Sequence, residues 1–326
     1  MKLTISQEDI IASLTPPLRD KLAHSINLLS KAEKIALRYD PEGYILAFSG
    51  GKDSQALYHV AQLSGVHFRA QMNLTSVDPP EVIRFIRQHY PEVHMIPPSE
   101  SIFSVAVRKK LVPTMRFRWC CHEFKENKTA GKVTLVGVRN EESTRRADRK
   151  EFEISKKHFS GDFEQLEQYQ QSLQTKKYIR KGRLRKSENG EYSVDCIYGK
   201  ETLTISPIIH WTESEVWEFL TAIRVPHCCL YDQGFHRIGC ILCPMLTPKV
   251  KQLEMKRYPH VRRNWIKAIH QIRQAGGMRA YQWTPRPDDD EDTICEAAFD
   301  WWMSQKSYQA WYQQKYAPQL PFEDED

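Results

Sequence analysis

Residues 44–54 of this 326-residue chain read YILAFSGGKDS, and this stretch decides the fold. Residues 44–48 are an apolar run with the length and the β-favouring residues of a buried strand. The glycines follow at once, and from Ala56 onward apolar residues recur at helical spacing. The pattern predicts a strand, a glycine turn and the beginning of a helix. The first N–H groups of a helix have no partner within it, so this turn can bind an anion, above all phosphate.

The turn itself is not a Walker A loop, because the GxxxxGK[ST] spacing is missing, and it is not GxGxxG. It resembles the SGGxDS loop of the ATP-pyrophosphatase (PP-loop) superfamily, which holds the phosphates of ATP or of an adenylyl nucleotide. The alternative is a glycine turn whose polar side chains serve only the first turn of a structural helix. The candidate nucleotide-binding residues are Ser49, Gly50, Gly51, Lys52, Asp53 and Ser54.

Composition indicates a soluble globular protein, with 40% hydrophobic and 27% charged residues. No stretch approaches the ~20 apolar residues of a membrane span, and the opening MKLTISQEDI has no apolar region of a secretory signal. We therefore expect a cytoplasmic protein without a membrane partner. In that compartment the eight cysteines are better explained as thiols, metal ligands or redox groups than as structural disulfides.

The net charge of +6 hides a segregation of charge. Residues 288–292 and the last five residues, FEDED, are acidic. A basic run is a possible contact for a polyanion such as nucleic acid, although a solvated loop is the simpler explanation. That run contains Lys176, Lys177, Arg180, Lys181, Arg183, Arg185 and Lys186.

Strands alternate with helices along the first half of the chain. Strands are predicted at 44–48, 68–74, 93–96 and 133–138, and helices at 7–40, 79–90 and 101–111. This alternation indicates an α/β fold with a parallel sheet covered by helices on both faces. Ligands of such sheets bind at the carboxyl ends of the strands. Ser49, residues 73–78 and the segment from Gly137 to Arg139 would meet there, so Gly137 and Arg139 join the nucleotide-binding candidates.

Three segments are predicted: N-terminal helices at 1–40, a nucleotide-binding domain at 41–250, and a helical C-terminal subdomain at 251–326. The polar stretch at about 155–200 is expected to be an insertion, with a hairpin that pairs 192–198 with 202–205. Thr212 opens a capping-box pattern and should begin a helix. The tryptophans of the last segment, Trp265, Trp283, Trp301, Trp302 and Trp311, are expected in its core.

The cysteines form two groups that suggest a metal centre. Cys120-Cys121 lies in RWCCHEFK, while Cys228-Cys229 and Cys240-x-x-Cys243 lie in HCCLYDQGFHRIGCILCP. A C-x-x-C pair directs two thiolates at one metal group. An iron–sulfur cluster or tetrahedral zinc would use the same residues. Buried inert thiols or a redox dithiol are the alternatives.

Five motifs in order resemble the phosphoadenosine phosphosulfate (PAPS) reductase family over residues 40–250. They are SGGKDS, the tandem cysteines, GVRNEESTRRA at 137–147, SPIIHWTESEVWEFL at 206–220 and LYDQGFHRIGCILC at 230–243. The iron–sulfur branch of the family implies a [4Fe–4S] cluster on Cys120, Cys121, Cys240 and Cys243. The related DNA phosphorothioation enzymes imply that Cys228 or Cys229 replaces Cys121.

Arg139, Glu142 and Arg146 follow the fourth predicted strand. Arginine suits bidentate contact with phosphate or sulfate, whereas an i,i+4 pair between Glu142 and Arg146 on a surface helix is the alternative. With the loop residues, the candidate catalytic set is Lys52, Asp53, Arg139 and Arg146.

The function expected from this resemblance is adenylyl transfer from ATP with Mg²⁺, followed by delivery of sulfur to the activated acceptor, for which nucleic acid is one candidate. A persulfide of a cysteine desulfurase is a possible sulfur donor. The family reductases end in a Glu-Cys-Gly-Leu-His tail that this chain lacks. The alternatives are a sulfonucleotide reductase that uses an external thiol, a sulfate adenylyltransferase-like subunit, or a nucleic-acid-associated binding component. The sequence does not predict the oligomeric state.

Overall fold

The computed structural model describes residues 3–144, 146–155, 159–175, 183–186, 192–277 and 289–316. The chain divides into two compact units. The first unit comprises Met1–Leu74, Pro79–Pro97 and Phe124–Gly239, and the second comprises Thr75–Asp78, Pro98–Glu123 and Cys240–Asp326. The three segments expected from the sequence remain a prediction.

The first unit is built on a mostly parallel sheet with the strand order β3-β2-β1-β4-β9-β5-β6. The strands β3, β2, β1, β4 and β9 are parallel neighbours in that spatial order. Strand β5 pairs antiparallel with both β9 and β6. The strands are β1 (Tyr44–Ala47), β2 (Phe68–Asn73), β3 (His94–Ile96), β4 (Val133–Leu135), β5 (Phe152–Ile154), β6 (Phe159–Gly161) and β9 (Leu203–Ile205). The predicted α/β fold is confirmed, but the sheet is mixed rather than wholly parallel.

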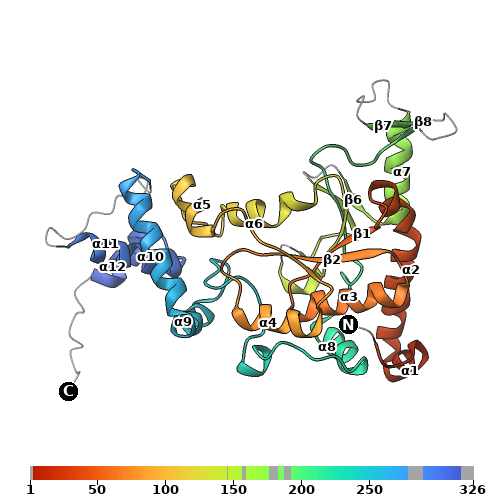
Figure 1. Ribbon diagram of the computed structural model, residues 1–326, viewed down its shortest axis with the longest axis horizontal. Coiled ribbons are helices and arrows are strands. Elements are labelled where there is room, and N and C mark those ends of the chain that lie inside the picture. Colours follow the sequence, from red (N-terminus) through yellow and green to blue (C-terminus); the bar gives the residue numbers. More distant parts are fainter. Residues whose placement is uncertain are drawn as a thin grey trace, which may run out of the picture. The chain divides into compact units, whose positions relative to one another are not determined.

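Helices flank this sheet, as the periodicity of their apolar residues predicts. In Figure 1, α2 lies beside β1 and packs on α3, which in turn packs on α8. The helix α2 buries the stripe of Leu18, Leu22 and Leu29. The helices of this unit are α1 (Gln7–Ser13), α2 (Pro16–Tyr39), α3 (Lys52–Ser64), α4 (Pro80–His89), α7 (Phe163–Gln174) and α8 (Glu213–Ala222), with short 3₁₀ turns η1 (Glu126–Thr129), η2 (Asn140–Glu142) and η5 (Tyr231–Gln233).

The hairpin predicted between 192–198 and 202–205 is wrong. Tyr192–Val194 forms β8, which pairs with β7 (Leu184–Lys186) in a separate two-stranded sheet. Residues 203–205 instead form β9 and enter the main sheet between β4 and β5. Apolar Leu203 and Ile205 are buried there, which a two-stranded hairpin could not achieve. The first four residues of the basic run, at 176–181, lie outside the described residues.

The second unit is helical in its described part. It contains α5 (Ile102–Lys109), most of α6 (Trp119–Phe124), α9 (Pro248–Arg257), α10 (Pro259–Gln274), α11 (Glu291–Ser304) and α12 (Tyr308–Tyr316). The predicted aromatic core is confirmed for Trp265, Trp301, Trp302 and Trp311, which are all buried. Trp283 lies outside the described residues. None of the helices described here combines the length and the apolarity that crossing a membrane requires.

Candidate functional site

The glycine turn is closely packed against α4. Gly50 has a φ of +71°, and a Cβ at this position would lie 2.9 Å from the Val82 side chain and 3.1 Å from Ile86. Both the left-handed backbone and the lack of space therefore require glycine here. Gly51 is the residue before α3, so the predicted strand, turn and helix N-terminus are confirmed as local structure.

Ser54 holds the turn closed from within the first turn of α3. Its hydroxyl donates to the Gly51 carbonyl oxygen at 2.8 Å, and it accepts from the Ser49 amide at 3.2 Å and from the Ser49 hydroxyl at 3.1 Å. These bonds within the chain fix the backbone of the turn. A turn that is already ordered loses little conformational entropy when it binds.

Gly137 joins the turn from the carboxyl end of β4. A Cβ on Gly137 would lie 2.7 Å from the Asp53 carbonyl oxygen and 3.1 Å from the Ser54 amide nitrogen. The segment after β4 therefore packs directly on the first turn of α3. Topology alone predicted that these two segments meet, because both follow neighbouring parallel strands.

Two buried cations and three carboxylates surround this turn. The Lys52 ammonium lies 3.4 Å from the Asp53 carboxylate and 3.3 Å from the Glu213 carboxylate, with its side chain only 5% exposed. The Arg139 guanidinium, 3% exposed, donates to Asp53 at 2.6 Å and to Glu141 at 2.8 Å. Asp53 thus bridges both cations. Both cations of the site are therefore paired with carboxylates of the same unit.

Tyr231 is a part of the site that the sequence reasoning missed. Its hydroxyl accepts the Lys52 backbone N–H at 2.8 Å, so it occupies one of the first N–H groups of α3. Burial raises the pKa of this phenol above its ordinary value. Tyr231 lies in the LYDQG segment that carries the family resemblance, and its place in that motif is the sequence feature that could have identified it as a site residue.

Arg146 is paired with Glu142, as the alternative of an i,i+4 pair expects, but the described residues after Glu142 form a loop and not the surface helix of that alternative. Glu142 is the last residue of the short η2 turn, and the Arg146 backbone N–H donates to the Ser143 carbonyl oxygen. The structure therefore gives Arg146 a carboxylate partner, and its contact with a nucleotide remains a prediction.

The second unit brings four cysteines together. A hydrogen bond with Cys121, together with burial, raises the pKa of the Cys120 thiol. The charges of Cys240 and Cys243 act on Cys120 in the same direction. Cys120 and Cys121 lie on α6, and the other two cysteines lie on the turn before α9. These are the four residues that the resemblance to the iron–sulfur branch selects.

Cys228 belongs to the first unit, where it is fully buried. Burial raises its pKa to about 11, and its neighbour Cys229 contributes in the same direction. Among the described residues, no three His, Cys, Asp or Glu side chains are grouped tightly enough to hold a single metal ion.

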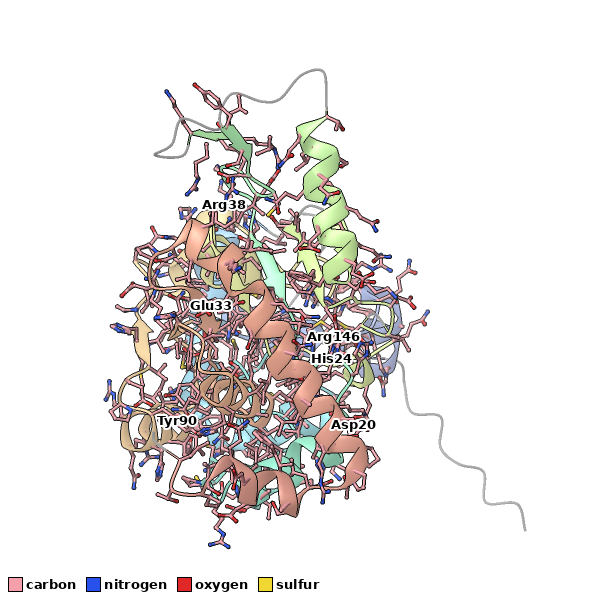
Figure 2. All side chains as sticks on the ribbon, turned by 90° about the vertical axis from the view of Figure 1, so that its right-hand side faces the viewer. Asp20, His24, Glu33, Arg38, Tyr90 and Arg146 are labelled. Atoms are coloured by element: carbon pink, nitrogen blue, oxygen red, sulfur yellow. The ribbon has the colours of Figure 1, made fainter. Side chains whose placement is uncertain are left out.

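A hollow lined by several charged and polar residues lies elsewhere in the first unit. Two adjoining cavities of about 300 and 330 Å³ share Glu151 and His210. The Glu151 carboxylate lies 2.5 Å from the His24 ring nitrogen and 3.7 Å from that of His210. Figure 2 shows His24 and Asp20 on α2, and both residues line the first of these cavities. None of the predicted site residues lines either cavity.

Comparison with known proteins shows the family of this chain. The sequence model of the phosphoadenosine phosphosulfate reductase domain matches residues 43–246, more than half of the chain. The chain belongs to this family. The matched range includes the glycine turn, Gly137, Arg139 and the six cysteines of the Cys-Cys and Cys-x-x-Cys motifs.

Relatives of this PAPS reductase family member match over different lengths. An uncharacterised protein of Methanocaldococcus jannaschii is 24% identical over 240 residues, which cover 70% of this chain and 41% of the relative. An adenosine 5′-phosphosulfate reductase of a Geobacillus species is 40% identical over 50 residues, or 15% of this chain and 21% of the relative. The chain therefore spans less than half the length of these curated relatives.

Solved structures with a similar arrangement include an FMN adenylyltransferase of Candida glabrata in complex with FMN and an ATP analogue. It has a TM-score of 0.41 at 15% identity and covers 74% of this chain and 68% of its own. A phosphoadenylyl-sulfate reductase of Candida auris has a TM-score of 0.37 at 14% identity, with 74% and 98% covered.

Proposed function

We propose that this chain binds ATP at Ser49–Ser54 and transfers the adenylyl group to an acceptor, with pyrophosphate as the leaving group. The observation that carries the proposal is the turn itself, which is ordered by Ser54 and opens onto the N-terminus of α3. In the reaction, an acceptor oxygen forms a bond to the α-phosphorus. The bond from that phosphorus to the bridging oxygen breaks, and the acceptor proton is lost.

Three side chains would serve this step. Lys52 exchanges its Glu213 partner for a phosphate oxygen, since Glu213 is half exposed and free to turn away. Asp53 offers a carboxylate for the Mg²⁺ that accompanies the nucleotide, which would stabilise the charge on the leaving pyrophosphate. Arg139 donates a hydrogen bond that holds Asp53 in place and adds positive charge near the phosphates.

Sulfur delivery is the second half of the proposal. A persulfide, such as that of a cysteine desulfurase, displaces AMP from the activated acceptor to give a disulfide. A second thiol then releases the thiolated product, forming a new disulfide. The four cysteines of the second unit are the residues that would hold an iron–sulfur cluster, because cysteine thiolates are its usual ligands and Cys120 interacts with the other three. When bound, such a cluster supplies redox chemistry or orients the sulfur donor.

Nucleic acid is the acceptor class that one surface favours. Met115–Arg118 are exposed, and the Phe117 ring is 56% accessible between Arg116 and Arg118. A hydrogen-bonded turn with Thr114 fixes Phe117 at this surface. An aromatic ring between two arginines suits a stacked base with its phosphates. Binding to single-stranded DNA or RNA that weakens steeply with salt supports this acceptor. Weaker binding by Phe117→Ala, and a salt slope lowered by about one in Arg116→Ala, would confirm the surface.

The test of the adenylyl step is pyrophosphate release from ATP by protein purified without oxygen, alongside ATP binding by calorimetry. Lys52→Met should abolish both. Glu213→Gln is the matched variant, because it removes the competing carboxylate and should preserve or strengthen ATP binding. Equal ATP affinity in the wild type and Lys52→Met would refute the proposal that this turn binds ATP.

A sulfonucleotide reductase that takes its thiol from another chain is the second candidate. The similarity to adenosine 5′-phosphosulfate reductases over short segments favours it. Release of sulfite from an adenylyl sulfate with an added dithiol, without pyrophosphate from ATP, selects this reading. Pyrophosphate exchange with sulfate as the acceptor selects a sulfate adenylyltransferase-like subunit, and nucleic-acid binding with no turnover selects a binding component.

A further inference from the structure

The turn between Cys240 and Cys243 has an unusual backbone. Leu242 has a φ of +55°, a left-handed conformation that costs energy for any residue with a Cβ. Its side chain is buried, so the conformation is imposed by the surrounding structure. A strained residue between two candidate ligands needs a group that holds it.

Glu254 on α9 is that group. Its carboxylate accepts the Leu242 N–H at 2.6 Å, and the residue is only 5% exposed. Burying a carboxylate is costly unless it is hydrogen-bonded, and a backbone N–H is the partner found here. The acceptor is therefore directed at the one amide that the turn presents in a left-handed conformation.

Lys251, one helical turn earlier on α9, is also buried, at 1% exposure. Its ammonium donates to the Met303 carbonyl oxygen at 3.1 Å, at the end of α11. Its charge interacts with Cys243 and with Glu254. A buried lysine with one carbonyl partner places a poorly solvated positive charge beside a candidate thiolate.

The remaining backbone of the loop is anchored within the same unit. The Gln305 amide group donates to the carbonyl oxygens of Pro244 and Leu246 at 2.5 and 2.7 Å. The Ile241 N–H donates to the Val77 carbonyl oxygen at 2.7 Å. The loop is thus fixed before and after Leu242.

We propose that Glu254 and Lys251 are positioning residues for the metal group of Cys240 and Cys243. Glu254 locks the turn so that both thiolates face the same group, and Lys251 offsets their negative charge. This inference rests on the proposed cluster. Removing a residue that hydrogen-bonds to or orients a metal ligand typically lowers metal affinity by about ten- to a hundredfold.

The test compares iron and sulfide content, the rate of iron release to a chelator, and the midpoint potential of anaerobic protein. Glu254→Ala should release iron at least about tenfold faster than the wild type. Glu254→Gln keeps an acceptor oxygen for Leu242 and should restore retention. Lys251→Met should shift the potential to more negative values, because reduction adds an electron where a positive charge has been removed.

Lys256→Met is the matched control, since Lys256 is exposed on the same helix. It should leave release rate and potential unchanged. If the wild type holds neither iron nor sulfide, the proposed cluster is wrong and this inference falls with it. If the wild type holds a cluster but Glu254→Ala and Lys251→Met behave like Lys256→Met, the cluster stands and the positioning role is refuted.

Discussion

Gly137→Ala is the sharpest probe of the nucleotide site, because it adds one methyl group where two backbone segments touch. The new Cβ would lie 2.7 Å from the Asp53 carbonyl oxygen and 2.9 Å from its carbonyl carbon, whereas ordinary contact begins at 3.4 Å. Neither atom can rotate away, since both belong to the main chain of α3. One of the two segments has to move.

The expected cost follows from overpacking. Inserting a methyl group into a closely packed site costs about 1–3 kcal/mol, which should appear as a lower urea midpoint. The displaced backbone is the one that presents the first N–H groups of α3. Affinity for ATP should therefore fall by about tenfold or more, since 1.4 kcal/mol corresponds to a factor of ten.

Gly239→Ala is the control, because nothing lies within 4 Å of its added Cβ. Its stability should stay within about 0.5 kcal/mol of the wild type. Unchanged urea midpoint and ATP affinity in Gly137→Ala would mean that the two segments separate without cost. The close approach at β4 would then play no part in shaping the site.

Three further outcomes can be checked by unfolding measurements. Arg139→Met removes the buried guanidinium from Asp53 and should cost about 2 kcal/mol or more, whereas a neutral result would mean that water replaces it. Tyr231→Phe removes the acceptor of the Lys52 N–H and should cost about 1 kcal/mol; no change would make that bond dispensable. Burial lowers the pKa of His59 to about 4 from 6.5, so the folded protein binds fewer protons than the unfolded one between these values. Stability should be full above about pH 6.5 and fall by up to ~3 kcal/mol towards pH 4, with a shallower slope in His59→Gln; equal slopes would contradict this.

The sequence predicted those parts of the fold that depend on neighbours in the chain. The glycine turn, the capping box at Thr212 and the apolar stripe of α2 each follow from rules that span a few residues. The meeting of Gly137 with the first turn of α3 needed one more step, the topology of parallel strands. Periodicity and topology together were therefore enough for the backbone of the site.

The contacts that long-range packing decides were not predictable in this way. Tyr231 reaches Lys52 across 179 positions, and nothing in the spacing of either residue indicates the other. Strand β7 consists of Leu184–Lys186, all exposed, so it has no alternation that would identify it as the partner of β8. The predicted hairpin turned at Gly199-Lys200, a local turn signal between its two strands. That local rule failed because the main sheet buries residues 203–205 more deeply than a hairpin would.

The position of β9 has a consequence for how this fold can diversify. Leu135 and Ile205 are register partners in neighbouring strands, so the segment between them, which includes β5 and β6 of the same sheet, ends beside the point where it began. The two ends of the segment between Leu135 and Ile205 are therefore held close together by the sheet. Closing a loop that is twice as long costs only about 0.6 kcal/mol more. Evolution, or a protein engineer, can therefore lengthen, shorten or exchange the outer part of this excursion while the phosphate-binding turn keeps its shape, so that recognition and chemistry can change independently.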